Sequence, residues 1–187
     1  NEEEFKRVAK KQYELLNESM LKVGFETFGT NMVSDMVNAK GGYPTRNWQT
    51  GVFDRIDEVG GQALVDKVLE GKVNCFACPI ACGRISKIKE GTWKGKEGEG
   101  PEYESAVTLG SMCGVSDMNA ITMANFLCNE YGLDTISCGS TIAFAMECYE
   151  KGILTSSDTG GLELRFGDGD MVVELLSLIH ISEPTRP

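Results

Sequence analysis

The sequence of 187 residues is poor in histidine, having only His180, and no apolar run in it approaches the length of a membrane-spanning helix. Basic residues are also few: 18 Lys and Arg face 28 Asp and Glu, for a formal net charge of −10 at pH 7. This charge argues against nucleic-acid binding, because phosphate backbones attract clusters of Lys and Arg. Because the sequence shows no signal peptide and no membrane-spanning segment, it predicts a cytoplasmic protein that does not bind a membrane.

Cysteine is well represented, with seven residues. Because this number is odd and the spacing suggests no regular disulfide pairing, we expect reduced thiols. Cys75, Cys78 and Cys82 stand in NCFACPIACGR with C-x2-C-x3-C spacing, so three thiolates can reach one centre from a single tight turn. Iron–sulfur clusters commonly take three clustered cysteines and one remote one, whereas structural zinc usually takes two separated pairs. The spacing therefore favours a cluster, with zinc as the alternative, and leaves a fourth ligand to be supplied elsewhere.

The two ends of the sequence do not resemble the ends of a complete protein. The chain begins at Asn1, without Met, directly in a helix-like sequence, which predicts a chain cut open upstream. Residues 176–187, LSLIHISEPTRP, resemble the conceptual translation of a sequencing-library transposon adaptor. We expect residues 1–175 to be native and 176–187 to be foreign, which removes His180 as a candidate ligand. The alternative is a genuine apolar strand followed by a loop.

Helical periodicity with little period-two alternation predicts an all-α, multihelical fold with irregular loops and at most a small hairpin. The apolar stripe from Glu2 to Leu21 predicts one helix ended by Gly24, and shorter helices are expected over 29–39 and 61–70. Glycines and mixed charge over 85–100 favour a hairpin or an exposed loop. Further helices are expected over 103–113, over 117–131 with Ser116 as cap, over 135–151, and from Asp168 or Asp170 onward.

The segment from Asn129 to Asp134 joins two of these helices. Gly132 is expected to end the first helix in a left-handed conformation, and Asp134 or Thr135 to cap the second. A helix N-terminus attracts anions and polar heteroatoms, and a carboxylate at Asp134 can accept hydrogen bonds from a ligand's amino groups. An ordinary turn with an Asp cap explains the same residues, so both interpretations stay open.

Five motifs, taken together and in order, resemble the aldehyde:ferredoxin oxidoreductase family of tungsten enzymes, which carry a bis-pterin cofactor and one [4Fe–4S] cluster. They are PTRNWQTGVF, the cysteine turn, GEGPEYE, CNEYGLDTIS and TGGLELRFGD, and the similarity spans nearly all of Glu2 to Leu175. The resemblance implies that the chain is the first part of the family's helical C-terminal half, a fragment of a larger α+β enzyme.

By this resemblance Cys75, Cys78 and Cys82 match the three clustered ligands of the [4Fe–4S] centre. The fourth ligand of the family lies in a downstream motif that this chain does not reach. The remaining cysteines could replace it, although their positions on apolar helix faces favour core packing. These four are Cys113, Cys128, Cys138 and Cys148.

The family's first pterin motif, Asp-x-x-Gly-Leu-Asp, is matched at Gly132, Leu133 and Asp134, with Asn129 in place of the first Asp. Asparagine keeps the hydrogen-bonding oxygen and adds a donor. These four residues are the cofactor-binding residues that the resemblance implies.

Glu104 lies where the family places a catalytic glutamate near the metal, and Glu102 is the neighbouring alternative. Such a carboxylate can move protons if burial raises its pKa toward neutrality. A solvated acid in the first turn of a helix explains Glu104 equally well from the residues alone. The family's catalytic histidine has no counterpart in residues 1–175.

The resemblance implies an oxidoreductase that converts an aldehyde and water to a carboxylate at tungsten or molybdenum and passes electrons through the cluster to ferredoxin. It also implies Mg²⁺ bridging the pterin phosphates, and it leaves a homodimer open. One alternative is a metallopterin reductase on the same scaffold with another substrate, such as an aromatic acyl-CoA. Another is a non-catalytic iron–sulfur or zinc-binding module. The fragment alone is expected to be inactive, since a domain and a cluster ligand are missing.

Overall fold

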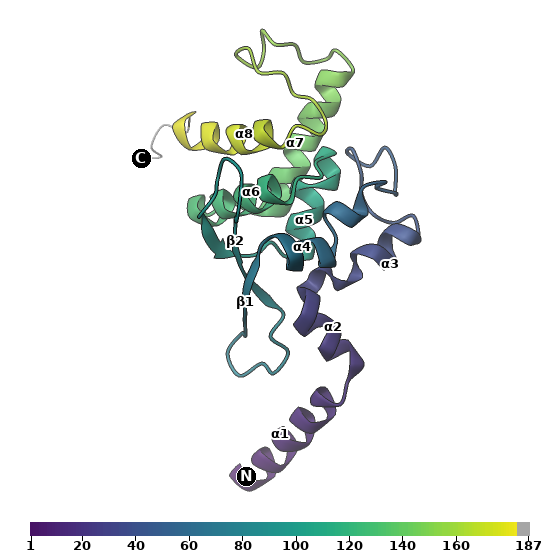
Figure 1. Ribbon diagram of the computed structural model, residues 1–187, viewed down its shortest axis with the longest axis vertical. Helices are drawn as coiled ribbons and strands as arrows, with labels where there is room; N and C mark the ends of the chain where they lie inside the picture. The colour runs from purple at the N-terminus through teal and green to yellow at the C-terminus, as the bar shows by residue number, and fades with distance from the viewer. Residues whose placement is uncertain (183–187) are drawn as a thin grey trace.

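Helices account for most of the structure, a computed structural model that describes residues 1–182 and the side chains of residues 1–178 (Figure 1). The α-helices are α1 (Glu2–Asn17), α2 (Met20–Phe28), α3 (Ser34–Ala39), α4 (Gly61–Lys67), α5 (Tyr103–Leu109), α6 (Met118–Tyr131), α7 (Thr135–Glu150) and α8 (Gly169–Ser182). Short 3-10 helices lie at Gly29–Val33, Ile56–Glu58 and Ser111–Cys113. The predicted multihelical class is therefore confirmed.

A small antiparallel sheet in the order β1-β2-β3 accompanies the helices and is one strand larger than the predicted hairpin. Its strands are β1 (Leu69–Val73), β2 (Gly83–Lys87) and β3 (Glu97–Glu99). Val73 pairs with Gly83, so the sheet brings together the two ends of the loop that carries the three cysteines. The helix expected over 61–70 ends at Lys67, because the chain then enters β1.

Helices α5, α6, α7 and α8 supply most of the core, with fully buried side chains that include Leu109, Ile121, Met146 and Leu176, and α4 adds Leu64. Asp168 caps α8 by accepting a hydrogen bond from the Met171 amide at 2.9 Å. The expected boundary between residues 175 and 176 falls inside this helix, which continues to Ser182. The foreign origin proposed for residues 176–187 remains a prediction, and 183–187 and the His180 side chain lie outside what the structure describes.

Helices α5 and α7 pack closely at Gly139, where a Cβ atom would lie 2.4 Å from the Thr108 carbonyl carbon and 2.5 Å from its oxygen. Gly139→Ala is expected to lower the free energy of unfolding by about 1–3 kcal/mol, because a rigid backbone must move to admit the methyl group. Thermal unfolding of the protein measures this loss.

Gly24→Ala is the matched control for the same chemical change in a helix. Its Cβ would meet only the flexible end of Met32, whose Sδ and Cε atoms lie at 3.0 Å. Alanine also has the higher helix propensity, so stability is expected to stay equal or to rise. Equal losses in the two variants would contradict the close packing of α5 on α7.

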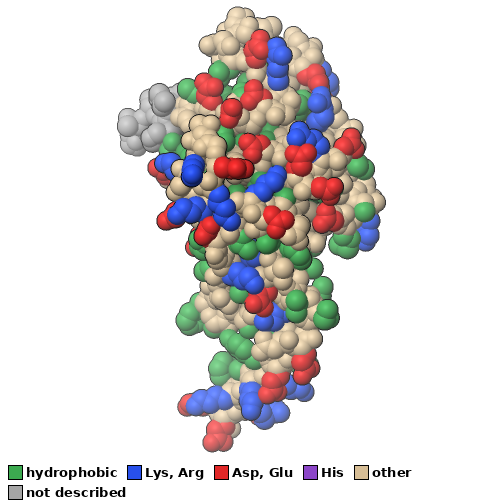
Figure 2. All heavy atoms as spheres, viewed as in Figure 1, with side chains coloured by type: hydrophobic (Ala, Val, Ile, Leu, Met, Phe, Trp, Pro, Cys, Tyr) green, Lys and Arg blue, Asp and Glu red, His purple; other side chains and the backbone are tan. Residues whose placement is uncertain are grey.

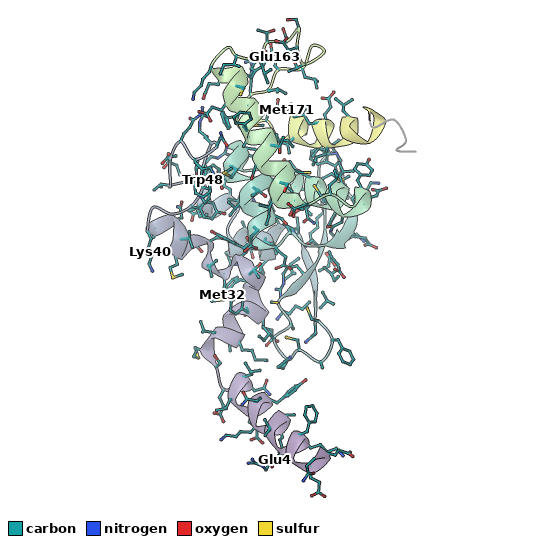
Figure 3. The ribbon with its side chains drawn as sticks, turned by 180° about the vertical axis from the view of Figure 1, so that it is seen from behind. Glu4, Met32, Lys40, Trp48, Glu163 and Met171 are labelled. Atoms are coloured by element: carbon teal, nitrogen blue, oxygen red, sulfur yellow. The ribbon has the colours of Figure 1, made fainter. Side chains whose placement is uncertain are left out.

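The N-terminal helices extend away from the core, and no residue of α1 or α2 is buried (Figure 1). Glu4 in α1 and Glu163 in the loop before α8 mark the two ends of the long axis (Figure 3). Apolar side chains on these helices are exposed, among them Phe5 at 72% and Met20 at 82%. Elsewhere on the face shown in Figure 2, basic and acidic side chains are interspersed. None of the helices in residues 1–182 combines the length and apolarity that crossing a bilayer requires.

The prediction of a single N-terminal helix is wrong in two respects. Ser19 adopts an extended conformation with ψ of 127°, which divides α1 from α2. Gly24 lies inside α2, which continues to Phe28, instead of ending it, and the Met32 side chain packs beside it. Two other expectations differ in detail: 29–39 begins as a 3-10 helix, and Asp117, not Ser116, caps α6.

Candidate functional site

The three cysteines of the C-x2-C-x3-C motif lie on the loop between β1 and β2. Cys75 is exposed, and Cys78 and Cys82 are half-buried. The Cys78 amide donates to the Cys75 carbonyl at 3.0 Å, and the Asn74 side chain donates to the Cys78 carbonyl at 2.7 Å. The first two cysteines therefore share one locally closed turn, as their spacing predicts.

Two left-handed residues set the course of this loop. Ala77 and Ala81 each have φ of +57°, and each immediately precedes a cysteine of the motif. Non-glycine residues seldom adopt this conformation, so contacts elsewhere must hold them in it. One such contact comes from α1, where the Tyr13 hydroxyl donates to the Ala77 carbonyl. The loop is thus supported by residues far away in the sequence.

The donor chemistry of the loop suits an iron–sulfur cluster, since three soft thiols are presented from one short segment. Among the described residues, no group of three or more His, Cys, Asp or Glu side chains is arranged to hold a single metal ion. Each thiolate of a cluster binds its own iron atom, so cluster ligands need not converge on one point. Burial raises the pKa of the Cys82 thiol, and the nearby Glu102 carboxylate raises it further.

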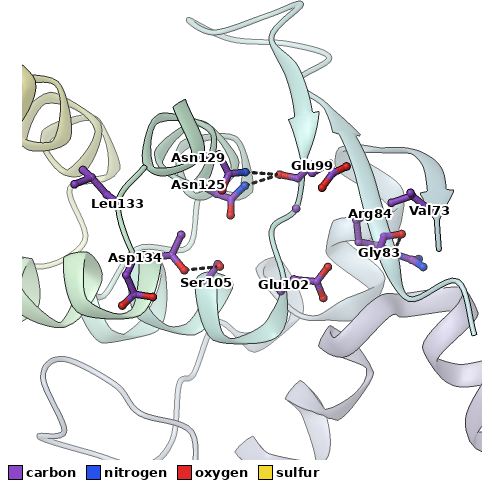
Figure 4. A pocket seen from close by; sticks show the side chains of 12 residues that line it. Val73, Gly83, Arg84, Glu99, Glu102, Ser105, Asn125, Asn129, Leu133 and Asp134 are labelled. Atoms are coloured by element: carbon purple, nitrogen blue, oxygen red, sulfur yellow. Dashed lines mark hydrogen bonds between the residues drawn. The ribbon is translucent and has the colours of Figure 1, made fainter. Parts of the chain in front are cut away.

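A pocket of about 300 Å³ adjoins this loop and is predominantly polar (Figure 4). It is formed where β2, the start of α5, the end of α6 and the start of α7 meet. Its lining residues are Val73, Gly83, Arg84, Glu99, Gly100, Glu102, Ser105, Asn125, Asn129, Leu133, Asp134 and Thr135. Residues directly after Cys82 therefore share a pocket with Asn129, Leu133 and Asp134.

The turn between α6 and α7 has the predicted geometry. Gly132 ends α6 with φ of 67° and ψ of 32°, and it lies at the turn itself, not among the lining residues. Asp134 caps α7 by accepting from the Ser137 amide at 2.7 Å, and hydrogen bonds from Ser137 lower the pKa of this carboxyl. Since Asp134 also lines the pocket, capping and ligand binding are compatible roles for the same side chain.

Two side-chain amides that line the pocket bond the same carbonyl group (Figure 4). Asn125 and Asn129 both donate to the Glu99 carbonyl, at 2.7 and 3.1 Å. Opposite them, the hydroxyls of Ser105 and Thr135 are 2.8 Å apart and join α5 to α7. Asn129 was expected from the motif. Asn125 lies one helical turn before it, and that spacing is the only sequence signal that could have indicated it.

The two candidate glutamates differ in position. Glu102 lines the pocket, and its carboxylate accepts a hydrogen bond from the Thr30 hydroxyl. Glu104 lies in the first turn of α5, exposed and outside the pocket lining. No described residue forms a hydrogen bond or ion pair with the Glu104 carboxylate, which leaves it available to another group.

The other four cysteines lie on or beside the core helices. Cys113 and Cys128 are buried, and burial raises the pKa of each thiol to about 12. Cys138 and Cys148 are partly buried on α7. At neutral pH the two buried groups are therefore protonated thiols, which behave as small apolar side chains.

Known proteins are similar to this chain over most of its length. The family model described as "Aldehyde ferredoxin oxidoreductase, domains 2 & 3" matches residues 7–183. The tungsten-containing aldehyde ferredoxin oxidoreductase of Thermococcus kodakarensis is 45% identical over 154 residues, which cover 82% of this chain and 25% of that protein. Its namesake from Pyrococcus furiosus is 41% identical over 153 residues, with coverages of 82% and 25%.

A more divergent relative carries a different name. The aliphatic sulfonate oxidoreductase, WOR-like subunit, of Pyrococcus furiosus is 34% identical over 137 residues, covering 73% of this chain and 22% of that protein. The chain thus spans about a quarter of the length of the curated relatives it matches.

Proposed function

Since this chain belongs to the aldehyde ferredoxin oxidoreductase family, we propose that it is the cluster- and pterin-binding part of an enzyme that oxidises aldehydes to carboxylic acids. One observation supports the proposal: Val73, Gly83 and Arg84, the strand residues that flank the cysteine loop, line the same polar pocket as Asn129, Leu133 and Asp134. An electron carrier and a redox cofactor bound at these two places would be neighbours.

In this proposal Cys75, Cys78 and Cys82 hold a [4Fe–4S] cluster, and the polar atoms of Asn129 and Asp134 orient the edge of a pterin. The tungsten or molybdenum bis-pterin, with Mg²⁺ on its phosphates, would supply two-electron oxidation, and the cluster would supply single-electron transfer. The protein contributes placement: the left-handed turn at Gly132 brings Leu133 and Asp134 to the pocket wall, and capping fixes the Asp134 carboxylate.

Glu104 is the proposed proton carrier, because its carboxylate has no partner among the described residues. A carboxylate acts as a general acid or base most effectively when its pKa lies near the working pH. The exposed face of α5 is where another part of the full-length enzyme could bury this group. Glu102 already accepts a hydrogen bond from Thr30, which suits a role in fixing the pocket wall.

The proposed electron acceptor is ferredoxin, which the names of the relatives contain. We place the enzyme in the cytoplasm, as the reduced thiols suggest, and a homodimer is compatible with the proposal. The relative named for aliphatic sulfonate supports a second candidate function, a metallopterin enzyme of the same scaffold with a substrate other than an aldehyde.

The test uses the full-length enzyme, purified without oxygen, for metal analysis and aldehyde-dependent dye reduction. Iron, tungsten or molybdenum, and aldehyde-dependent turnover are expected together, whereas the 187-residue chain alone is expected to be inactive. Iron and tungsten without aldehyde turnover would favour the second candidate. Zinc without iron would contradict the proposal and indicate a structural zinc module.

A further inference from the structure

Arg84 on β2 has the largest of the fully buried side chains in the described part of the chain, with 1% of its surface exposed. Burial of a charged group is costly unless polar partners replace the water it loses. The guanidinium of Arg84 meets this requirement with backbone carbonyls alone. None of the ion pairs found among the described residues includes it, so no carboxylate neutralises its charge by direct contact.

The carbonyl partners of Arg84 come from two segments that are distant in the sequence. At the end of α2, its Nη1 and Nη2 atoms donate to Phe25, Glu26 and Thr27 at 3.0–3.4 Å. On the cysteine loop, the guanidinium donates to the carbonyls of Ala81 at 2.6 Å and Cys82 at 3.0 Å, and also to Gly83. One side chain therefore joins the C-terminal end of a helix to the last arm of the loop.

The two segments approach so closely that no side chain fits between them. Gly29, which follows α2 with φ of +64°, would place a Cβ 3.0 Å from the Cys82 carbonyl oxygen and 3.1 Å from the Arg84 Cδ. The last carbonyls of a helix have no partners within it, and Arg84 satisfies several of them. The position of Cys82 is thus set by α2 through Arg84.

The charge of Arg84 has a second consequence at this place. A buried cation acts through a medium of low dielectric constant, where its field is stronger than in water. Net charge and hydrogen bonding near a cluster are among the factors that set its reduction potential. Reduction adds a negative charge to a cluster, so a nearby cation stabilises the reduced form and raises the potential.

We propose that Arg84 is a positioning residue of the iron–sulfur site: it braces the Ala81–Cys82 arm against α2, and its charge keeps the cluster potential high. This inference rests on the proposed function, since it assumes that Cys82 is a cluster ligand. In this proposal Arg84, which lies outside the cysteine motif, affects both how firmly the protein retains the cluster and the reduction potential of the cluster.

The experiment uses the full-length enzyme with Arg84→Gln, which keeps an amide donor but removes the charge, and Arg84→Lys, which keeps the charge but not the fork of donors. Iron content, iron loss to a ferrous chelator and a potentiometric titration followed by electron paramagnetic resonance are measured. Arg84→Gln is expected to shift the cluster potential to more negative values. Arg84→Lys is expected to stay closer to the wild-type potential and to lose iron several times faster.

Arg55→Met is the control for loss of a positive charge, because Arg55 is an exposed partner of Glu58 and should leave the potential unchanged. An iron-replete Arg84→Gln enzyme with the wild-type potential would overturn the inference. If Arg84→Gln does not fold or take up iron, the Arg84→Lys enzyme provides the test. Iron loss from Arg84→Lys at the wild-type rate would overturn the bracing role. Absence of iron from the wild-type enzyme would instead overturn the proposed function.

Discussion

Cys78→Ser in the full-length enzyme is expected to remove most of the iron and to abolish electron delivery to an acceptor, while the helical content stays near that of the wild type. Cys78 is the middle ligand of the proposed set and is half-buried in the turn closed by the Asn74 hydrogen bond. A serine hydroxyl is a harder and far less acidic ligand than a thiol, so the cluster loses one of its bonds to the protein.

The fold should survive this substitution, because no residue of the cysteine loop belongs to the buried core. Iron and acid-labile sulfide analysis measure the loss of the cluster, and circular dichroism measures the helical content. Cys148→Ser is the matched control: it makes the same chemical change on α7, at a partly buried position. Wild-type iron content in Cys78→Ser would refute the ligand assignment, and iron loss in Cys148→Ser would reopen the search for the fourth ligand within this chain.

Glu104→Gln in the full-length enzyme is expected to lower kcat by about 10²–10⁴-fold, the range that loss of a general acid or base usually costs. The substitution keeps the size and polarity of the side chain and removes only the titrating proton. Iron and tungsten content should therefore remain unchanged, since the Glu104 carboxylate forms no hydrogen bond or ion pair with a described residue and the substitution leaves its backbone bond to Thr108 in place.

Glu102→Gln is the paired variant, two residues away in the same GPEYE segment. An amide can still accept the hydrogen bond from Thr30, so the pocket wall should keep its shape and kcat should fall much less. Steady-state kinetics with a dye acceptor across a range of pH compare the two. A larger loss of kcat in Glu102→Gln would move the proton-carrying role to the glutamate that lines the pocket.

The local features of this site were predictable because they depend on hydrogen bonds between near neighbours. The left-handed Gly132, the Asp134 cap and the turn joining Cys75 to Cys78 each close within a few residues. Helix boundaries were less predictable. The break at Ser19 and the strand that follows Lys67 depend on packing against other segments, which periodicity does not reveal.

The sequence by itself determined the residue types that matter, namely the thiols of the C-x2-C-x3-C motif and the Asn129–Asp134 segment, together with the multihelical class. Only the tertiary structure decided that the strand residues flanking the cysteine loop share one pocket with the Asn129–Asp134 segment, and that Glu102, not Glu104, lines it. It also decided that Arg84 is buried between α2 and the cysteine loop. The reason is physical. The Arg84 guanidinium binds carbonyls more than fifty residues away in the sequence, and contacts at that separation produce no periodicity or motif spacing from which burial could be predicted.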